Sequence, residues 1–172
     1  MAKIILGLDP GIADTGYGVI SDDGGKISCL AYGSIKTSPK DDLITRLESL
    51  YCQLSGVIKE YKPEVAAVEE LFFSKNVKTA LTVGHARGVI LLTLKQNNLK
   101  MYEFKPSQVK QAVACYGAAD KKQIQKMVQI LLKLKEIPQP DDAADALAIA
   151  MCALNSYKAE IIINLAKARN RA

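Results

Sequence analysis

Acidic residues at three separate places in the sequence have the type and setting that could do chemistry. Asp9 ends a short apolar run, Glu69 and Glu70 end another, and Asp142 and Asp145 lie close together in a segment rich in alanine and leucine. Clustered carboxylates repel one another, and a hard divalent cation relieves that repulsion. Oxygen ligands suit Mg²⁺ or Mn²⁺, and two such ions roughly 4 Å apart can promote hydrolysis of a phosphodiester. If these acids meet, the sequence predicts that chemistry.

Each acid also has an ordinary structural explanation. Asp9 precedes Pro-Gly and could belong to a turn, Asp141 or Asp142 could cap a helix, and the two glutamates could be a solvated strand end. Three separate elements ending in carboxylate at one predicted sheet edge favour a joint site. Asp142 and Asp145 share a helical face, but Asp141 is four residues from Asp145 and helical spacing does not exclude it. Whether Asp141 or the second glutamate assists stays open.

The elements that must position these acids can be read from hydrophobic periodicity and turn residues. Strands are expected at Ile4–Leu8, Tyr17–Ser21, Lys26–Lys36, Val65–Glu70 and Lys100–Phe104, and helices at Asp41–Tyr61, Asn76–Gln96, Ser107–Cys115, Asp120–Lys135 and after Pro140. The first three strands form an antiparallel meander, and the fourth should run parallel to the first because a helix lies between them. The fold class is therefore α/β, with a five-stranded mixed sheet flanked by helices.

Length and composition indicate one soluble globular domain. The chain has 172 residues, of which 49% are hydrophobic and 24% charged. Its first apolar stretch is too short for a signal sequence, and no run is expected to span a membrane, so a cytoplasmic location is predicted. The cysteines form no CxxC pair, and the chain contains a single histidine, which argues against a zinc site or a disulfide scaffold. The cysteines are therefore expected to be small buried residues. The residues concerned are Cys29, Cys52, Cys115, Cys152 and His85.

Positive charge is concentrated in the second half of the chain. Between residues 95 and 135 only Glu103 and Asp120 are acidic. The lysines there are Lys95, Lys100, Lys105, Lys110, Lys121, Lys122, Lys126, Lys133 and Lys135. This excess points to a polyanionic partner, although a solvated surface that keeps a protein soluble gives the same pattern.

The helix expected at residues 76–96 is apolar on nearly all sides. Such a helix needs two partners. One would be the sheet, and the other could be the same helix of a second subunit, with Gly84, Ala86 and Gly88 allowing close approach. A core helix of a monomer is the alternative.

Five segments carry a resemblance to a known family. LGLDPGIADTGYGVI, AVEELFFSKNVKTAL, GHARGV, PSQVKQAVACYG and DDAADALAIA, in this order, are similar to the motifs of the RuvC crossover-junction endodeoxyribonucleases, the Holliday junction resolvases. The resemblance covers nearly the whole chain. It implies a ribonuclease H-like fold, a homodimer, Mg²⁺ dependence and paired symmetrical nicks in four-way junctions during homologous recombination and DNA repair. It also implies cooperation with a branch-migration complex.

The resemblance also assigns roles to residues. By motif position, the catalytic and metal-binding set is Asp9, Glu69, Asp142 and Asp145, and this set leaves out Glu70 and Asp141. Phe72 matches an aromatic that stacks on unpaired bases, with core packing as the alternative. Further DNA contacts are expected at Lys75, Lys78, Arg87, Lys110, Lys121 and Lys122.

Residues 1–158 are expected to form the nuclease domain, and residues 159–172 a flexible, basic C-terminal tail. Three rival functions stay open. One is another ribonuclease H-like nuclease, and the second is an actin-like nucleotide-binding domain, whose first hairpin also carries aspartate and glycines. The third is a DNA-binding scaffold of the same fold without catalysis.

Overall fold

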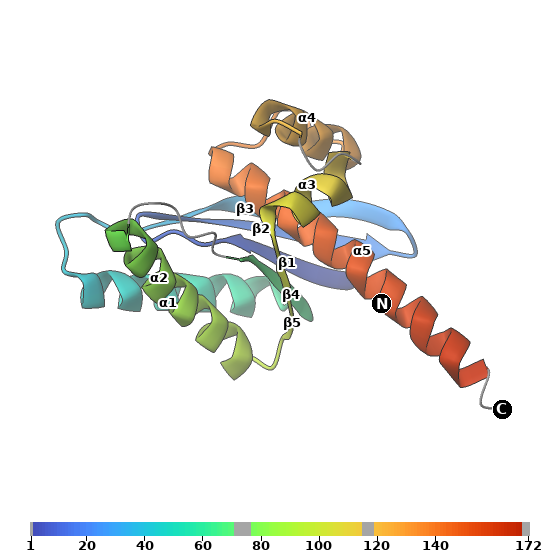
Figure 1. Cartoon of the computed structure of the whole chain (residues 1–172), viewed down its shortest axis with the longest axis horizontal. Coiled ribbons are helices and arrows are strands. Elements are labelled where there is room, and N and C mark those ends of the chain that lie inside the picture. Colours follow the sequence, from blue (N-terminus) through green and yellow to red (C-terminus); the bar gives the residue numbers. More distant parts are fainter. Residues whose placement is uncertain (1, 71–76, 115–118, 170–172) are drawn as a thin grey trace.

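The computed structural model describes residues 2–70, 77–114 and 119–169 of the chain. Its centre is a five-stranded sheet in the order β3-β2-β1-β4-β5. The strands are β1 (Lys3–Asp9), β2 (Asp14–Asp23), β3 (Lys26–Lys36), β4 (Val65–Glu69) and β5 (Lys100–Phe104). The helices are α1 (Leu43–Tyr61), α2 (Val77–Gln96), α3 (Pro106–Ala114), α4 (Lys121–Leu131) and α5 (Asp141–Arg169). Helices α1 and α2 cover one face of the sheet, and α5 with α3 and α4 covers the other (Figure 1).

The pairing of the strands confirms the expected meander and crossover. Strand β1 runs antiparallel to β2, and β2 runs antiparallel to β3. Strand β1 runs parallel to β4, with Leu8 opposite Val68, and β4 runs parallel to β5. The next residues along the two central strands, Asp9 and Glu69, therefore end β1 and β4 at the same edge of the sheet.

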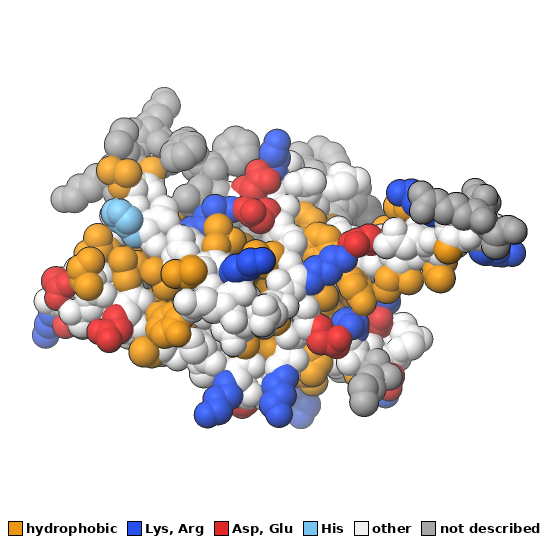
Figure 2. Space-filling model, turned by 90° about the horizontal axis from the view of Figure 1, so that it is seen from below, with side chains coloured by type: hydrophobic (Ala, Val, Ile, Leu, Met, Phe, Trp, Pro, Cys, Tyr) orange, Lys and Arg blue, Asp and Glu red, His pale blue; other side chains and the backbone are white. Residues whose placement is uncertain are grey.

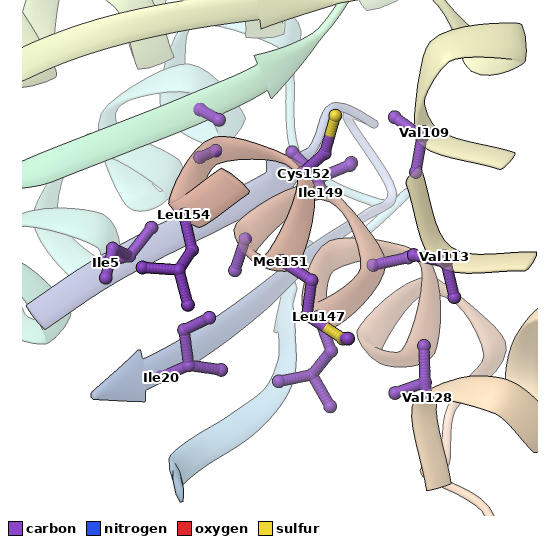
Figure 3. Close-up of a cluster of buried hydrophobic side chains, with 14 of the residues drawn as sticks. Ile5, Ile20, Val109, Val113, Val128, Leu147, Ile149, Met151, Cys152 and Leu154 are labelled. Carbon is purple, nitrogen blue, oxygen red and sulfur yellow. The ribbon is translucent and has the colours of Figure 1, made fainter. Parts of the chain in front are cut away.

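Alternation along the strands decides which way these two acids face. Leu8 and Val68 belong to the core beneath α1 and α2, whereas Ala67 belongs to the core beneath α5. Because successive side chains of a strand point to opposite faces, Asp9 and Glu69 point to the face covered by α5. Figure 3 shows part of that core, where α5 contributes Leu147, Ile149, Met151, Cys152 and Leu154 opposite Ile5 and Ile20 of the sheet.

Helix α5 lies directly on β1 and β2 because glycines face it. A Cβ at Gly7 would lie 2.1 Å from the main-chain oxygen of Ala146, and one at Gly16 would lie 2.0 Å from that of Asp142. No real side chain tolerates such distances, so these positions require glycine. The close approach places the first turn of α5 above the ends of the central strands.

Capping residues set the helix bounds. Asp42 accepts hydrogen bonds from the main-chain N–H groups of Ile44 and Thr45 at the start of α1, as the sequence allows. Asp120 begins α4 with a capping box. Helix α4 is shorter than the predicted 120–135, because Lys133 adopts a left-handed conformation with φ 53°. That conformation ends a helix.

The cysteines correct one expectation. Cys152 is buried and Cys29 is partly buried, but Cys52 is exposed, because it lies on the outer side of α1. Cys115 lies outside the described residues. The prediction of small buried residues is therefore wrong for Cys52.

Helix α5 is long and apolar enough to cross a membrane by length and composition, contrary to the prediction that no segment would be. Half of its most apolar stretch is buried inside the protein, where the helix packs against the sheet. The helix continues across the domain boundary expected at residue 158 and projects from the body (Figure 1). Apolar side chains of this projection, including Ile162 and Leu165, are exposed (Figure 2). The division into a domain and a flexible tail stays a prediction.

Candidate active site

Three carboxylates from two elements meet at the edge of the sheet. Oxygens of Asp9, Asp142 and Asp145 all lie within 4.8 Å of one another. Asp9 comes from the end of β1, and the other two come from the first turns of α5, where a spacing of three residues places them on one face. All donors are oxygens, which fits a hard divalent cation such as Mg²⁺ or Mn²⁺.

Glu69 lies beside these three carboxylates but is not among the residues whose oxygens lie within 4.8 Å of one another. It ends β4, the strand beside β1, and its charge raises the pKa of Asp9. Burial raises the pKa of Glu69 itself, and Asp145 raises it further. The four carboxylates that the sequence singled out are therefore brought to one place, with Glu69 on the side of α3 and α4.

Burial and mutual repulsion both favour the protonated forms of these acids. The pKa of Asp9 is raised to about 8, mainly by burial and also by the charges of Glu69, Asp145 and Asp142, while Lys121 opposes them. Burial is also the largest cause of the raised pKa values of Asp142 and Asp145. A bound divalent cation reverses this balance, because it stabilises the ionised forms. The cluster is thus costly as four free anions and suited to binding a cation.

Lys121 is the cation nearest to the cluster among the described residues. Its Nζ lies 3.2 Å from Oδ2 of Asp145 and 3.4 Å from Oδ2 of Asp141. Burial lowers the pKa of Lys121, but the two aspartates outweigh burial and raise it. Gln125 donates a 2.8 Å hydrogen bond to Oδ1 of Asp141, so both oxygens of Asp141 are engaged by α4.

A cavity of about 210 Å³ opens beside the carboxylates. It has two acids and two lysines on one part of its wall and apolar side chains on the rest. The lining residues are Glu69, Asp145, Lys110, Lys121, Pro106, Val109, Ile124 and Ala148. An anion next to a metal site would find both cations within this cavity.

The remaining DNA-contact residues predicted from the sequence lie in different places. Lys122 is exposed on α4 and lines a separate shallow hollow with Lys126. Arg87 lies on α2, across the sheet from the carboxylates. Phe72 and Lys75 lie outside the described residues, and only the backbone of Lys78, in α2, is described.

Sequence reasoning missed one acid near the site. Asp14 begins β2, and its charge raises the pKa of Asp142. Among the described residues, no hydrogen-bond partner reaches its buried Oδ1, and Lys36 lies 4.0 Å from its Oδ2. The signal was available in the hairpin pairing, because the start of β2 lies opposite the end of β1.

The sheet order and the carboxylates at the ends of β1 and β4 define an α/β protein of the ribonuclease H-like class. The profile of the family described as Crossover junction endodeoxyribonuclease RuvC matches residues 5–153. The chain belongs to this family, whose members are metal-dependent nucleases.

Individual relatives agree with this assignment. Crossover junction endodeoxyribonuclease RuvC of Caldicellulosiruptor saccharolyticus is 59% identical over 149 residues, which cover 86% of this chain and 90% of that protein. The solved structure of T. thermophilus RuvC in complex with Holliday junction substrate has a TM-score of 0.83 and 38% identity, covering 87% of this chain and 92% of the other. The yeast mitochondrial resolvase Ydc2, at 14% identity and a TM-score of 0.62, shares the fold.

Proposed function

We propose that this chain resolves Holliday junctions by paired symmetrical nicks through metal-dependent hydrolysis of phosphodiesters, in homologous recombination and DNA repair. The observation that carries the proposal is the meeting of Asp9, Asp142 and Asp145 beside Glu69. The RuvC relatives named as crossover junction endonucleases, and the one solved with a junction, support the choice of substrate.

We infer that Asp9, Glu69, Asp142 and Asp145 hold two Mg²⁺ ions, with Mn²⁺ as a substitute. Protein sites for one Mg²⁺ use one or two carboxylates together with water and substrate phosphate, so four carboxylates support two ions. When bound, the ions activate water and stabilise the leaving 3′-oxygen. The four carboxylates would hold the ions beside the ends of β1 and β4, and the glycines beneath α5 keep Asp142 and Asp145 within reach of Asp9.

Lys110 and Lys121 are proposed to bind phosphate beside the metal site. Both line the cavity that Glu69 and Asp145 share. Lys121 would then exchange its ion pairs with the aspartates for a phosphate oxygen once a metal neutralises those acids. Such contacts orient the DNA without reading its sequence.

Lys122 is proposed as a further phosphate contact, because it extends the cationic surface along α4. The roles of Phe72 in base stacking and of Lys75 and Lys78 in phosphate binding rest on the motif resemblance. They stay part of the proposal.

Paired nicking by a symmetric enzyme calls for two active sites, and α2 offers a surface for dimerisation. Leu81, His85, Gly88 and Leu92 recur at helical spacing on its outer side, and the two leucines are 60% and 57% exposed. A Cβ at Gly88 would meet no atom within 4 Å among the described residues, so a partner helix could come close there. In Figure 2 the histidine lies among apolar side chains. We propose a homodimer through this surface, located in the cytoplasm and working with a branch-migration complex.

The carboxylate variants test the proposal. Asp9→Asn and Glu69→Gln should reduce junction cutting by about 100-fold or more, because each removes a metal ligand whose charge stabilisation is worth several kcal/mol. Junction binding should survive, because the phosphate contacts lie on other residues. Asp23→Asn, on the exposed β2–β3 hairpin, is the matched control and should cut normally. Equal losses of binding and cutting in the two variants would contradict this division of roles.

A further inference from the structure

The side chain of Arg87 makes two contacts within the protein on the side of the sheet opposite the carboxylates. Its Nε donates a hydrogen bond of 3.4 Å to the main-chain oxygen of Glu69, and its Nη2 forms an ion pair with Glu103. Only 19% of the Arg87 side chain is exposed, compared with 46% for Glu103. The guanidinium is thus held in place by acceptors on two neighbouring strands.

These two acceptors lie at the adjacent ends of β4 and β5. Glu103 of β5 is the register partner of Val68, the residue before Glu69. The main-chain N–H of Glu70 donates a 2.8 Å hydrogen bond to Phe104, which continues the pairing by one step. Arg87 therefore joins the ends of β4 and β5 to helix α2.

Glu69 needs such support because its neighbours repel it. Asp9 ends the neighbouring strand at the same edge of the sheet, and Asp145 lines the same cavity as Glu69, so three carboxylates of like charge lie close together. This repulsion pushes the strand end away from the other ligands before a cation binds. A contact to the main chain of Glu69 resists that displacement without touching the site itself.

We propose that Arg87 is a positioning residue that holds the end of β4, so that Glu69 stays within reach of the metal site. The inference rests on the proposed function, and it replaces the prediction of a phosphate contact at Arg87. Leu8 and Val68 face α2, whereas the carboxylates face α5, so the arginine lies behind the sheet as seen from the site. Groups that orient metal ligands typically change metal affinity or activity by 10- to 100-fold when they are lost.

The test compares Arg87→Gln, Arg87→Lys, Glu103→Gln and the double variant R87Q/E103Q. Lys95→Gln is the control, because it removes one exposed positive charge from the same helix. Two Mg²⁺-dependent quantities are measured: the rate of cutting at saturating enzyme as Mg²⁺ is varied, and the rise in Tm on adding Mg²⁺ without DNA. Junction affinity is measured over a range of salt concentrations in a buffer without Mg²⁺.

A positioning role predicts that Arg87→Gln needs about 10-fold or more extra Mg²⁺ in both metal assays, with junction affinity and its salt dependence unchanged. Glu103→Gln should raise the Mg²⁺ requirement as well. The double variant should need no more Mg²⁺ than Arg87→Gln, because both substitutions break the same Arg87–Glu103 ion pair. Arg87→Lys should restore the wild-type Mg²⁺ requirement only in part, because the lysine ammonium does not reproduce the planar set of N–H donors of the guanidinium.

A phosphate contact would give different results, and those results would overturn the inference. Arg87→Gln would weaken junction binding and lower the salt slope by about one, Arg87→Lys would restore binding, and Glu103→Gln would not reduce cutting. Unchanged Mg²⁺ dependence in Arg87→Gln would also overturn it. If Arg87→Gln does not fold, Glu103→Gln provides the test: an unchanged Mg²⁺ requirement in that variant would overturn the inference. A wild-type chain that binds Mg²⁺ but cuts no junction would refute the proposed function, while the Tm measurement would still test Arg87.

Discussion

Asp9 combines burial with three acidic neighbours, which is why its pKa is raised to about 8. The group is at the centre of the site, between Glu69 on β4 and the two aspartates on α5. A carboxyl in this setting carries a proton near neutral pH until a cation displaces it. The same property that prepares the site for metal therefore destabilises the folded chain when metal is absent.

This cost predicts a pH dependence of stability. Between the ordinary pKa of 3.8 and about 8, the unfolded chain has released the Asp9 proton that the folded chain keeps, so stability falls as pH rises across that window. Asp9→Asn removes this loss. In EDTA, the variant should be more stable than the wild type by about 2 kcal/mol or more near pH 8, and about equal below pH 4. Urea unfolding at several pH values measures the difference, and Mg²⁺ should stabilise only the wild type strongly.

Asp23→Asn provides the control for this measurement, because Asp23 is exposed on the β2–β3 hairpin. It should follow the wild-type curve at every pH. Parallel curves for Asp9→Asn and the wild type would show that Asp9 is not held in the protonated form.

At the scale of elements, the acids at the strand ends could be predicted from the sequence because each ends a periodic segment. Asp9 and Glu69 were singled out in this way, Asp142 and Asp145 by their shared face at the start of a helix, and the choice of these four over Glu70 and Asp141 came from the motif resemblance. The contact of α5 with the sheet could not be predicted. Gly7 and Gly16 read as ordinary strand and turn residues, and their role depends on a helix more than a hundred residues away.

The partners of Arg87 were hidden for a similar reason. Its place in GHARGV suggested a basic residue for DNA. Only the strand register and the burial of α2 reveal that it reaches Glu69 and Glu103 from behind the sheet. The end of α4 could not be predicted from hydrophobic periodicity either. The helix ends at Leu131, shortly before Lys133 adopts a left-handed conformation, and the spacing of apolar residues does not indicate that conformation.

The contact between α5 and the sheet gives a prediction at this scale. Gly16→Ala would place a Cβ 2.0 Å from the main-chain oxygen of Asp142, so the first turn of α5 must move. We expect a loss of about 1–3 kcal/mol in the free energy of unfolding. Cutting should fall by about 100-fold, because a shift near 1 Å misplaces the ligands. Urea unfolding and junction cutting measure the two effects.

Gly56→Ala is the matched control. Gly56 lies on an exposed side of α1, where a Cβ would meet no atom within 4 Å among the described residues. Alanine there should stabilise the chain by about 0.5–1 kcal/mol through helix propensity and leave cutting unchanged. Equal behaviour of the two variants would contradict the importance of the close approach.

At the scale of the whole molecule, the two faces of the sheet have different roles. The face covered by α3, α4 and α5 carries the carboxylates and the lysine-lined cavity. The face covered by α1 and α2 carries the apolar surface proposed for dimerisation. Arg87 connects the two, because it belongs to α2 and holds the end of β4.

This arrangement predicts that Leu92→Glu disrupts the dimer. A charge on the outer side of α2 would have to be buried between two subunits, which is costly. Light scattering should give about twice 18.7 kDa for the wild type and 18.7 kDa for the variant. Ile44→Glu, at a position on α1 that is 73% exposed, is the control and should remain a dimer. A wild-type monomer that makes paired nicks would contradict the proposed assembly.

The most direct test of the central claim is to incubate the wild-type chain with synthetic four-way junctions and with duplexes of the same sequence, with and without Mg²⁺, and to map the nicks on every strand. The four carboxylates at one edge of the sheet predict cutting only with Mg²⁺. The RuvC relatives and the proposed dimer predict that the cuts fall on junctions, at symmetrical positions in two strands. Cutting in EDTA, equal cutting of duplexes, or no cutting of junctions with Mg²⁺ would contradict the account.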